Sequence, residues 1–365
     1  MKTSVKAGLM LVGVLALMTS GCVVNQGGGG SSSSGAAPGT SAAPGTSAPK
    51  LSGSLTVACG AQEDWCKAMA AAFEAKTGVK TTYVRLSSGE AVTRLEGSKA
   101  SPEFDVWHGG PADGYNQAKT KGLLAQYKSP NADAIDAQYK DAEGYWTGVY
   151  VGALGFCSNT DVLKQKGVEV PQTWDDLLNP KLVKNVEMAH PSSSGTAYTT
   201  VWTQTVLRGS EDAAIEYLKK LNANILQYPK TGSAPGEAAA RGEVAVGIIF
   251  THDCVMFAEQ TGAPLKVTFP TDGTGYEIGG VAMIQGAKNP AAAKAYVDWA
   301  LTAEAQNIGP TVKSYQVLTA PGAVSDPRSA KLADIKLIKY DFAAAAAAKT
   351  HLLDRFNNEV AQKPA

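Results

Sequence analysis

The chain has 365 residues, and its 33 Lys and Arg residues balance 33 Asp and Glu residues, so the formal net charge is zero. The sequence contains no block of basic residues, and we therefore expect no nucleic-acid partner. The part from residue 51 onward, about 315 residues, is larger than a single hydrophobic core usually supports, which predicts two lobes.

The N-terminus has the pattern of a bacterial secretion signal. Basic residues precede an apolar run at residues 7–18, and three small residues then lead to Cys22. The run is too short for a membrane-spanning helix, which needs about 20 residues, but it suits a cleaved signal. The position of Cys22 resembles a lipoprotein cleavage motif, so we expect residues 1–21 to be removed and Cys22 to carry lipid. Thr19 departs from the motif, and an ordinary cleaved signal is the alternative.

Residues 22–50 consist mostly of Gly, Ser, Ala, Pro and Thr. Such a segment has little apolar surface to bury, so it predicts a flexible tether between the lipid and a globular body. No later hydrophobic run is long enough to cross a membrane.

Four cysteines remain if Cys22 is acylated, and an even number in an exported protein favours disulfides. Cys59 and Cys66 are close in sequence, and we expect them to pair. For Cys157 and Cys254 two interpretations stay open: a second bridge, or two buried free thiols.

Strand-like and helix-like segments alternate along the body. We expect strands at residues 55–58, 81–86, 104–107, 148–156, 186–189, 244–250 and 277–284. We expect helices at residues 62–76, 91–99, 115–121, 173–178, 195–207, 213–221, 291–303 and 342–360. In the first helix Trp65, Met69 and Phe73 recur every four residues, which places Trp65 in the core.

Alternation of strands and helices predicts an α/β architecture with open, mostly parallel sheets. In such sheets ligands bind at the carboxyl ends of strands, next to helix N-termini. The loops that follow strands are therefore the candidate binding segments.

Two of these loops are rich in hydroxyl groups. Ser87 and Ser88 stand between a strand and a helix, and the same arrangement recurs in the loop that contains Ser193, Ser194, Gly195 and Thr196. Backbone N–H groups and the helix dipole favour an anion at such a place, so both loops predict phosphate or carboxylate binding. Simple helix capping by serine is the alternative.

A second set of polar residues lies at other strand and helix ends. His252 and Asp253 follow the apolar strand at residues 244–250, Gln62 opens the first helix, and Glu277 precedes two glycines. A His–Asp pair can bind hydroxyl groups or a metal ion, and the alternative is a structural pair that caps the next helix.

Catalytic motifs do not emerge from the sequence. It contains no nucleophile elbow, no phosphate loop with its Lys-Ser/Thr ending and no zinc-protease helix, and the four histidines are scattered. We therefore expect no enzymatic activity, no cofactor and no metal site.

Several segments together resemble the ferric-type branch of bacterial periplasmic binding proteins over residues 51–327. They are, in order, LTVACGAQEDWCKAMAAAFEAKTGVK, DVWHGG, TGVYVGALGF, PQTWDDLLNP, HPSSSGTAYT and GEVAVGII. The resemblance implies a type II fold, in which two α/β lobes joined by hinge strands hold a ligand in their cleft. It also implies a monomer that delivers its ligand to an ABC permease. We expect lobe 1 at residues 51–150, completed by residues 275–365, and lobe 2 at residues 151–274.

The departures from this branch point to the ligand. Iron-binding members carry a Tyr–Tyr pair where this chain has His252 and Asp253, and often a histidine near the position of Gln62. A His–Asp pair with a later glutamate, here Glu277, resembles hexose-phosphate-binding members. This similarity implies that the serine loops hold a phosphate while Gln62, His252, Asp253 and Glu277 recognise hydroxyl groups. Arg85 precedes the first serine loop and could assist.

The expected ligand is therefore a sugar phosphate. A ferric-iron carrier, a phosphonate or other organophosphate carrier, and a phosphatase that traps its substrate are the alternatives.

Overall fold

The computed structural model describes residues 51–361. The predicted signal segment, the tether and Cys22 lie outside these residues. The strands are β1 (Ser54–Cys59), β2 (Lys80–Arg85), β3 (Val106–Pro111), β4 (Thr147–Asn159), β5 (Val186–Glu187), β6 (Val246–Phe250), β7 (Leu265–Thr268), β8 (Tyr276–Met283) and β9 (Val317–Leu318).

The main helices are α1 (Glu63–Thr77), α2 (Ser88–Gly97), α3 (Ala112–Thr120), α4 (Thr160–Lys166), α5 (Gly195–Arg208), α6 (Glu211–Asn222), α7 (Ala234–Ala240), α8 (Thr251–Thr261), α9 (Pro290–Ala300), α10 (Ala303–Gln306), α11 (Ile308–Thr311) and α12 (Phe342–Arg355). The short 3-10 helices are η1 (Ala132–Ala134), η2 (Ala137–Tyr139), η3 (Asp175–Leu178), η4 (Pro180–Leu182) and η5 (Leu332–Asp334). A π-helix, η6 (Phe356–Val360), continues α12.

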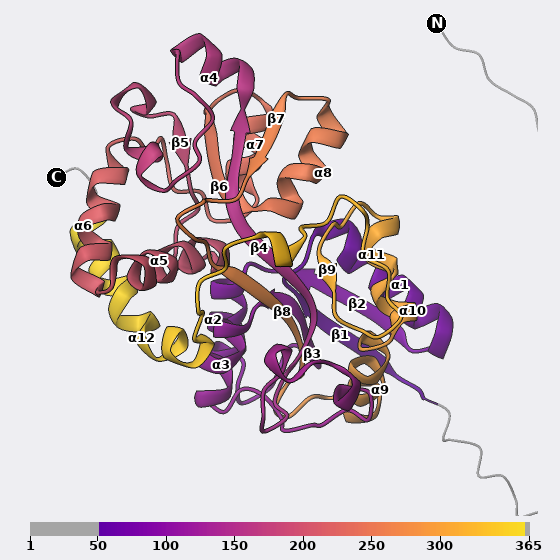
Figure 1. Cartoon of the computed structure of the whole chain (residues 1–365). Helices are drawn as coiled ribbons and strands as arrows, with labels where there is room; N and C mark the ends of the chain where they lie inside the picture. Colours follow the sequence, from indigo (N-terminus) through magenta and orange to yellow (C-terminus); the bar gives the residue numbers. More distant parts are fainter. Residues whose placement is uncertain (1–50, 362–365) are drawn as a thin grey trace, which may run out of the picture. The chain divides into compact units, whose positions relative to one another are not determined.

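The strands follow one another in the order β2-β1-β3-β8-β4-β6-β5, with β7 and β9 also paired to β4 (Figure 1). β1 runs parallel to β2 and β3, and β5 runs parallel to β6. β4 and β8 run antiparallel to their partners. The α/β architecture is as expected. The strand pairing is mixed rather than mostly parallel, because β4 and β8, in the middle of the strand order, run antiparallel to their neighbours.

β4 connects two hydrophobic cores. Its N-terminal half contributes Val149 and Tyr150 to a core with β1 and α1, while Leu154 and Phe156 in its C-terminal half pack with β6, α5 and α6. We call the part built on β1, β2 and β3 the first lobe, and the part built on β5, β6 and β7 the second lobe. The residue boundaries predicted for the lobes stay a prediction.

Most expected elements are present, with ends shifted by a few residues. Five α-helices were not expected: α4, α7, α8, α10 and α11. The Gly-Gly-Pro segment at residues 109–111 completes β3 and leads directly into α3. His252 and Asp253, expected at the end of a strand, lie in the first turn of α8.

The C-terminal helix α12 packs against both lobes. Lys349 Nζ donates to Asp113 Oδ2 of α3 at 2.7 Å, and both side chains are buried. Leu352 and Phe356 join the core of the second lobe. The end of the chain therefore holds α3 of the first lobe next to the second lobe.

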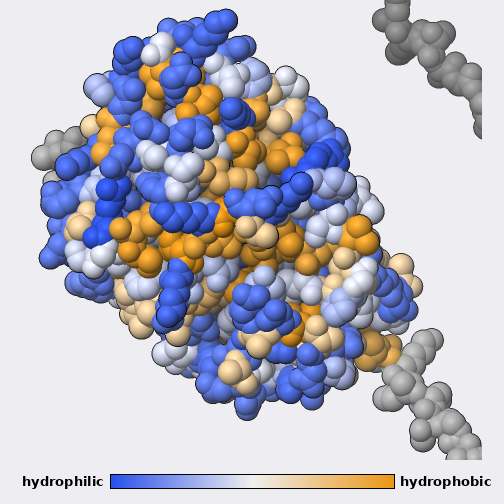
Figure 2. Space-filling model, in the orientation of Figure 1, coloured by the Kyte–Doolittle hydropathy of each residue, from blue (hydrophilic) through white to orange (hydrophobic). Residues whose placement is uncertain are grey.

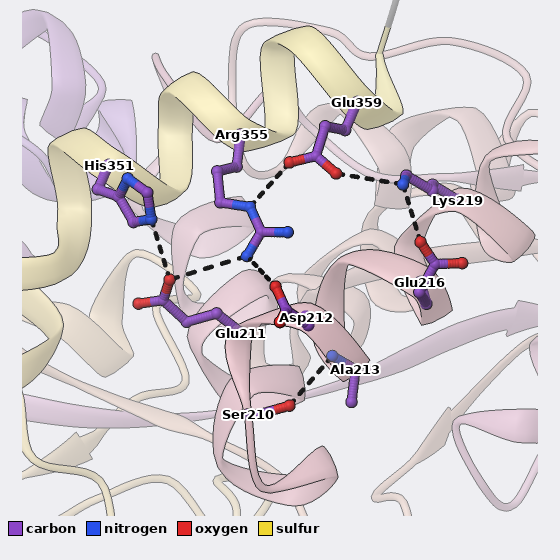
Figure 3. A network of polar contacts seen from close by, with 9 residues as sticks. All are labelled: Ser210, Glu211, Asp212, Ala213, Glu216, Lys219, His351, Arg355 and Glu359. Atoms are coloured by element: carbon purple, nitrogen blue, oxygen red, sulfur yellow. Dashed lines mark hydrogen bonds and ion pairs between the residues drawn. The ribbon is translucent and has the colours of Figure 1, made fainter.

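A surface network of polar contacts reinforces the packing of α12 on the second lobe (Figure 3). Arg355 donates to Asp212 of α6 at 2.7 Å and to Glu359 at 2.8 Å. Lys219 of α6 lies 3.1 Å from Glu359, and His351 lies 3.2 Å from Glu211. Solvent screens such pairs, so they orient α12 on α6 more than they stabilise the fold.

One face of the molecule carries an apolar band at mid-height, over α5 and the middle of β4 (Figure 2). In residues 51–361 the exposed large hydrophobic side chains are Val183, Leu226 and Val324. Within the same residues no helix is long and apolar enough to cross a membrane.

The expected Cys59–Cys66 disulfide is present, and so is a second bridge. Cys59–Cys66 joins the end of β1 to the first turn of α1, and Cys157–Cys254 joins β4 to the first turn of α8. The second pairing, left open by the sequence, is thus a bridge. Its partners come from strand β4 and from a helix that the sequence did not predict.

The two bridges should differ in their contribution to stability. Their cysteines are 97 and 7 residues apart, so loop closure in the unfolded chain predicts a loss of about 5 kcal/mol for Cys157→Ala/Cys254→Ala and about 2 kcal/mol for Cys59→Ala/Cys66→Ala. Urea unfolding of both double variants measures the difference. An equal loss from the two would contradict this account.

His108 should make stability depend on pH. Its two ring nitrogens are buried without a hydrogen-bond partner, and burial lowers its pKa from 6.5 to about 4. Below pH 6.5 the unfolded chain binds a proton that the folded protein excludes, so the free energy of unfolding should fall, by up to about 3 kcal/mol near the folded pKa. Urea unfolding as a function of pH measures this effect.

The matched control is His108→Phe, because every other titrating group is common to both proteins. The stability of the variant should decline less than that of the wild type in the same pH range. Parallel pH profiles would rule out His108 as the source.

Candidate functional site

A small, partly open cavity lies where the two lobes meet. Residues of both lobes and of β4, β8 and the segment before β9 line it. They are Gly60, Ala61, Gln62, Arg85, Ser87, Ser88, Gly110, Pro111, Tyr150, Ser194, Gly195, Thr196, Gly232, Ser233, Phe250, His252, Asp253, Glu277 and Gln316.

Six helices begin at this cavity. The residues that precede α1, α2, α3, α5, α7 and α8 all belong to its wall: they are Gln62, Ser87, Pro111, Ser194, Ser233 and Phe250. Free N–H groups and the positive ends of the helix dipoles therefore point to one space. This arrangement favours an anion without requiring many cationic side chains.

Arg85 is the one cationic side chain among the cavity-lining residues that the structure describes. Its Nε donates to the carbonyl oxygen of Ala61 at 3.0 Å, which holds the guanidinium at the wall. The sequence suggested an assisting role for Arg85, and its position is compatible with that role.

The first serine loop divides its hydroxyl groups between two tasks. Ser87 donates to the Glu90 carboxylate from its N–H at 3.2 Å and from its hydroxyl at 2.7 Å, and these bonds lower the pKa of Glu90. The capping interpretation is therefore right for the Ser87 hydroxyl. Ser88 lines the cavity, and its hydroxyl makes no hydrogen bond to residues 51–361. Ser88 is the free donor of this loop.

The second serine loop shows a similar division. Ser194 lines the cavity and caps α5 by accepting from the Ala197 N–H at 3.3 Å. The Ser193 hydroxyl donates to the Lys230 carbonyl at 2.9 Å and does not line the cavity. Gly195 and Thr196 complete the wall, so five of the six residues predicted to hold a phosphate face one space.

The two serine loops contact each other directly. The Gly89 N–H donates to the Ser193 carbonyl at 2.9 Å, across the boundary between the lobes. A Cβ atom at Gly89 would lie 2.3 Å from the Ser192 carbonyl oxygen, and one at Gly195 would lie 2.8 Å from the Pro111 ring. Glycine is therefore needed at both positions for the lobes to approach this closely.

The four polar residues predicted to recognise hydroxyl groups also meet in the cavity. His252 Nε2 lies 3.3 Å from Asp253 Oδ1 and 4.0 Å from Glu277 Oε1. Gln62 Nε2, from the other lobe, donates to Asp253 Oδ1. A Cβ atom at Gly152 would lie 2.9 Å from the His252 ring, so glycine there makes room for the group.

Burial sets the protonation of this group. It lowers the pKa of His252, against the opposing effect of the Asp253 carboxylate. It also raises the pKa of Glu277 well above its usual value, and the charges of Asp253 and Asp113 act in the same direction. Neutral imidazole and neutral carboxylic acid both donate and accept hydrogen bonds, which suits hydroxyl groups of a ligand.

Sequence analysis missed several lining residues. Tyr150 accepts the Gly110 N–H at 3.0 Å through its hydroxyl, which leaves its own proton free to donate. Gly232 and Ser233 precede the unexpected helix α7, and Gln316 precedes the two-residue strand β9. Gly232, Ser233 and Gln316 stand in no quoted segment, and the segment around Tyr150 carries no binding signal, so only the three-dimensional arrangement reveals these residues.

Residues 51–361 contain no cluster of three His, Cys, Asp or Glu residues that could hold a metal ion. Tyr150 is the one tyrosine in the described cavity wall.

The chain matches the bacterial extracellular solute-binding protein family over residues 68–335. It belongs to this family. An uncharacterized protein of Haemophilus influenzae is 40% identical over 296 residues, which cover 80% of this chain and 85% of that protein. A putative 2-aminoethylphosphonate-binding periplasmic protein of Salmonella typhimurium is 27% identical over 252 residues, which cover 66% of this chain and 70% of that protein.

Among solved structures, the chain is similar to the periplasmic binding protein AfuA from Actinobacillus pleuropneumoniae, with exogenous fructose-6-phosphate bound. The identity is 42% and the TM-score 0.83, with 85% of this chain and 99% of that chain covered. This similarity confirms the expected two-lobe type II fold. Together with the family, it identifies the chain as the extracytoplasmic solute-binding component of an ABC importer, which captures a small solute and works with a membrane permease.

The contact between the serine loops predicts an effect of Gly89→Ala. The added Cβ cannot coexist with the Ser192 carbonyl, so closure should be hindered while the separate lobes stay intact. Calorimetric titration with inorganic phosphate, the simplest anion for these loops, should show an affinity loss of about tenfold or more.

Gly97→Ala in the same helix is the matched control, because a Cβ atom there meets nothing within 4 Å. It should bind phosphate as the wild type does. Equal affinity of Gly89→Ala and the wild type would mean that binding does not need the loops to touch.

Proposed function

We propose that this protein is a lipid-anchored receptor that binds a phosphorylated small polyol, a sugar phosphate, for import. The observation that carries the proposal is the composition of one cavity. Helix N-termini with free donors line it together with a buried, largely neutral set of hydroxyl-binding groups.

The phosphate would lie against the starts of α2 and α5. Backbone N–H groups there, the Ser88 hydroxyl and the Arg85 guanidinium supply donors to the anion. The partial charges of several helix ends offset its negative charge. Because most of these donors are fixed dipoles, the protein needs little formal positive charge in the cavity.

The sugar hydroxyl groups would lie against Gln62, His252, Asp253 and Glu277. Asp253 accepts hydrogen bonds, while neutral His252 and protonated Glu277 can each donate and accept. A ligand that touches donors on both lobes would favour the closed arrangement, because only differential contacts shift a conformational equilibrium. The permease would then receive the closed, loaded form.

The remaining parts of the proposal rest on the N-terminal sequence and on similarity. Cys22 would carry the lipid, and residues 22–50 would tether the body to the membrane. AfuA, 42% identical, has been solved with a sugar phosphate in place, which supports the ligand class. The protein would act as a monomer without catalysis.

A phosphonate and ferric iron are the two other candidate ligands. The 27% identical relative named for 2-aminoethylphosphonate makes a phosphonate the second candidate, since such a ligand would use the same serine loops. Ferric iron prefers anionic oxygen ligands such as tyrosinate. The described cavity wall offers one tyrosine, Tyr150, whose pKa burial raises, so iron is disfavoured.

A thermal-shift comparison of fructose 6-phosphate, glucose 6-phosphate, 2-aminoethylphosphonate, inorganic phosphate and Fe(III) tests the proposal. A sugar phosphate should give the largest rise in melting temperature, because it would contact both the serine loops and the hydroxyl-binding residues. A ligand at 100 times its Kd adds about 2.7 kcal/mol of stability. Asp253→Asn should abolish most of that rise but keep the weaker effect of inorganic phosphate. The exposed Asp354→Asn is the matched control.

A larger shift with the phosphonate or with iron than with either sugar phosphate would overturn the proposal. If Asp253→Asn kept the full sugar-phosphate shift, the assignment of Asp253 as a hydroxyl-binding residue would be wrong. Release of inorganic phosphate during incubation with a sugar phosphate would instead indicate an enzyme.

A further inference from the structure

Gln316 occupies a defined position next to the hydroxyl-binding group. β9 pairs antiparallel with β4, with Val317 opposite Val151, so Gln316 stands next to Gly152. On the other side of β4, Gly152 pairs with Glu277 of β8. Gln316 and Glu277 therefore flank Gly152 in one row across three strands, and paired residues of antiparallel strands point to the same face.

The missing side chain of Gly152 identifies that face. A Cβ atom built there would lie 2.9 Å from the His252 ring and 3.0 Å from Glu277 Oε1. The side of β4 that Gly152 leaves open is thus the side on which His252 and Glu277 lie. Gln316 borders the same space and lines the same cavity.

The Gln316 amide is buried and incompletely bonded. The residue is 2% exposed, and its Oε1 has no hydrogen-bond partner within residues 51–361. The Nδ1 atom of His252, in the same cavity wall, is also buried without a partner. Buried polar side-chain atoms are nearly always bonded, so two unpartnered atoms in one wall indicate groups whose partner is the ligand.

We propose that Gln316 is a ligand-contacting residue that selects for the hydroxylated part of the ligand. This assignment rests on the function proposed above and adds a fifth residue, from the C-terminal segment, to the hydroxyl-binding group. An amide both donates and accepts, so Gln316 matches a ligand hydroxyl, which does the same. It offers no charge to a phosphate.

The same segment also holds the helix that carries His252 and Asp253. Tyr315, adjacent to Gln316, donates to Glu259 of α8, and Arg328 donates to Glu259 at 2.8 Å. Glu259 therefore fixes the segment to α8, while Gln316 faces the cavity. The hydroxyl-binding residues from α8, β8 and the segment before β9 form one connected wall.

Calorimetric titration of the full chain with fructose 6-phosphate and with inorganic phosphate tests the assignment. Gln316→Met keeps the side-chain length but removes the amide, and Gln316→Leu serves as a second variant. Fructose 6-phosphate affinity should fall about tenfold, and phosphate affinity should stay within about twofold of the wild type. The exposed Gln285→Met is the matched control.

The melting temperature of the ligand-free variants distinguishes a ligand-binding role of Gln316 from a structural one. Removal of an unpartnered buried amide should leave its melting temperature unchanged or higher. A lower melting temperature with equal losses for both ligands would overturn the assignment, as would wild-type affinity in both variants. A wild-type protein that binds neither glucose 6-phosphate nor fructose 6-phosphate would overturn both this assignment and the proposed function.

Discussion

Strand β4 is the constraint on which the site depends. It pairs with β8 and β9 in the first lobe and with β6 and β7 in the second, so one backbone belongs to both sheets. Helices that follow strands begin at the carboxyl ends of those strands. Because both lobes are built around the same strand, the helix starts of both face one space beside it.

The electrostatics of that space follow from its construction. Helix starts supply partial positive charge, and Arg85 supplies the one formal cation of the described cavity wall. Buried acidic and basic groups next to them are driven toward neutral forms, as the directions of the His252 and Glu277 pKa shifts indicate. A site of this kind separates recognition of charge, by backbone dipoles, from recognition of shape, by neutral side chains.

Sequence patterns predicted the elements and loops with strong local signals. Alternating strands and helices, the Trp65 stripe and both serine loops are where they were expected, because periodicity and helix-start chemistry are local. The mixed pairing of β4 and β8 was missed, since strand direction depends on long-range topology. Helix α8 was missed because His252 and Asp253, in its first turn, were assigned to the end of the preceding strand.

The binding residues that stand in loops with a local sequence signal were also predictable. Nine of the ten predicted ligand-binding residues line the cavity, and Ser193 instead supports the loop from behind. Ser233 and Gln316 could not be found in the sequence because they come from segments without a motif, placed by α7 and by the pairing of β9 with β4. Tyr150 stands in a quoted segment of β4, but nothing in that segment marks it as a cavity residue. Their contribution is a property of tertiary contacts alone.

The bridge between Cys157 and Cys254 has a consequence for where the protein can work. Cys254 follows Asp253 directly, so the covalent link to β4 immobilises the turn that presents His252 and Asp253. Thiols stay reduced in the bacterial cytoplasm and become oxidised only after export. Before export the chain would lack this link, and the turn that presents His252 and Asp253 would be held less firmly.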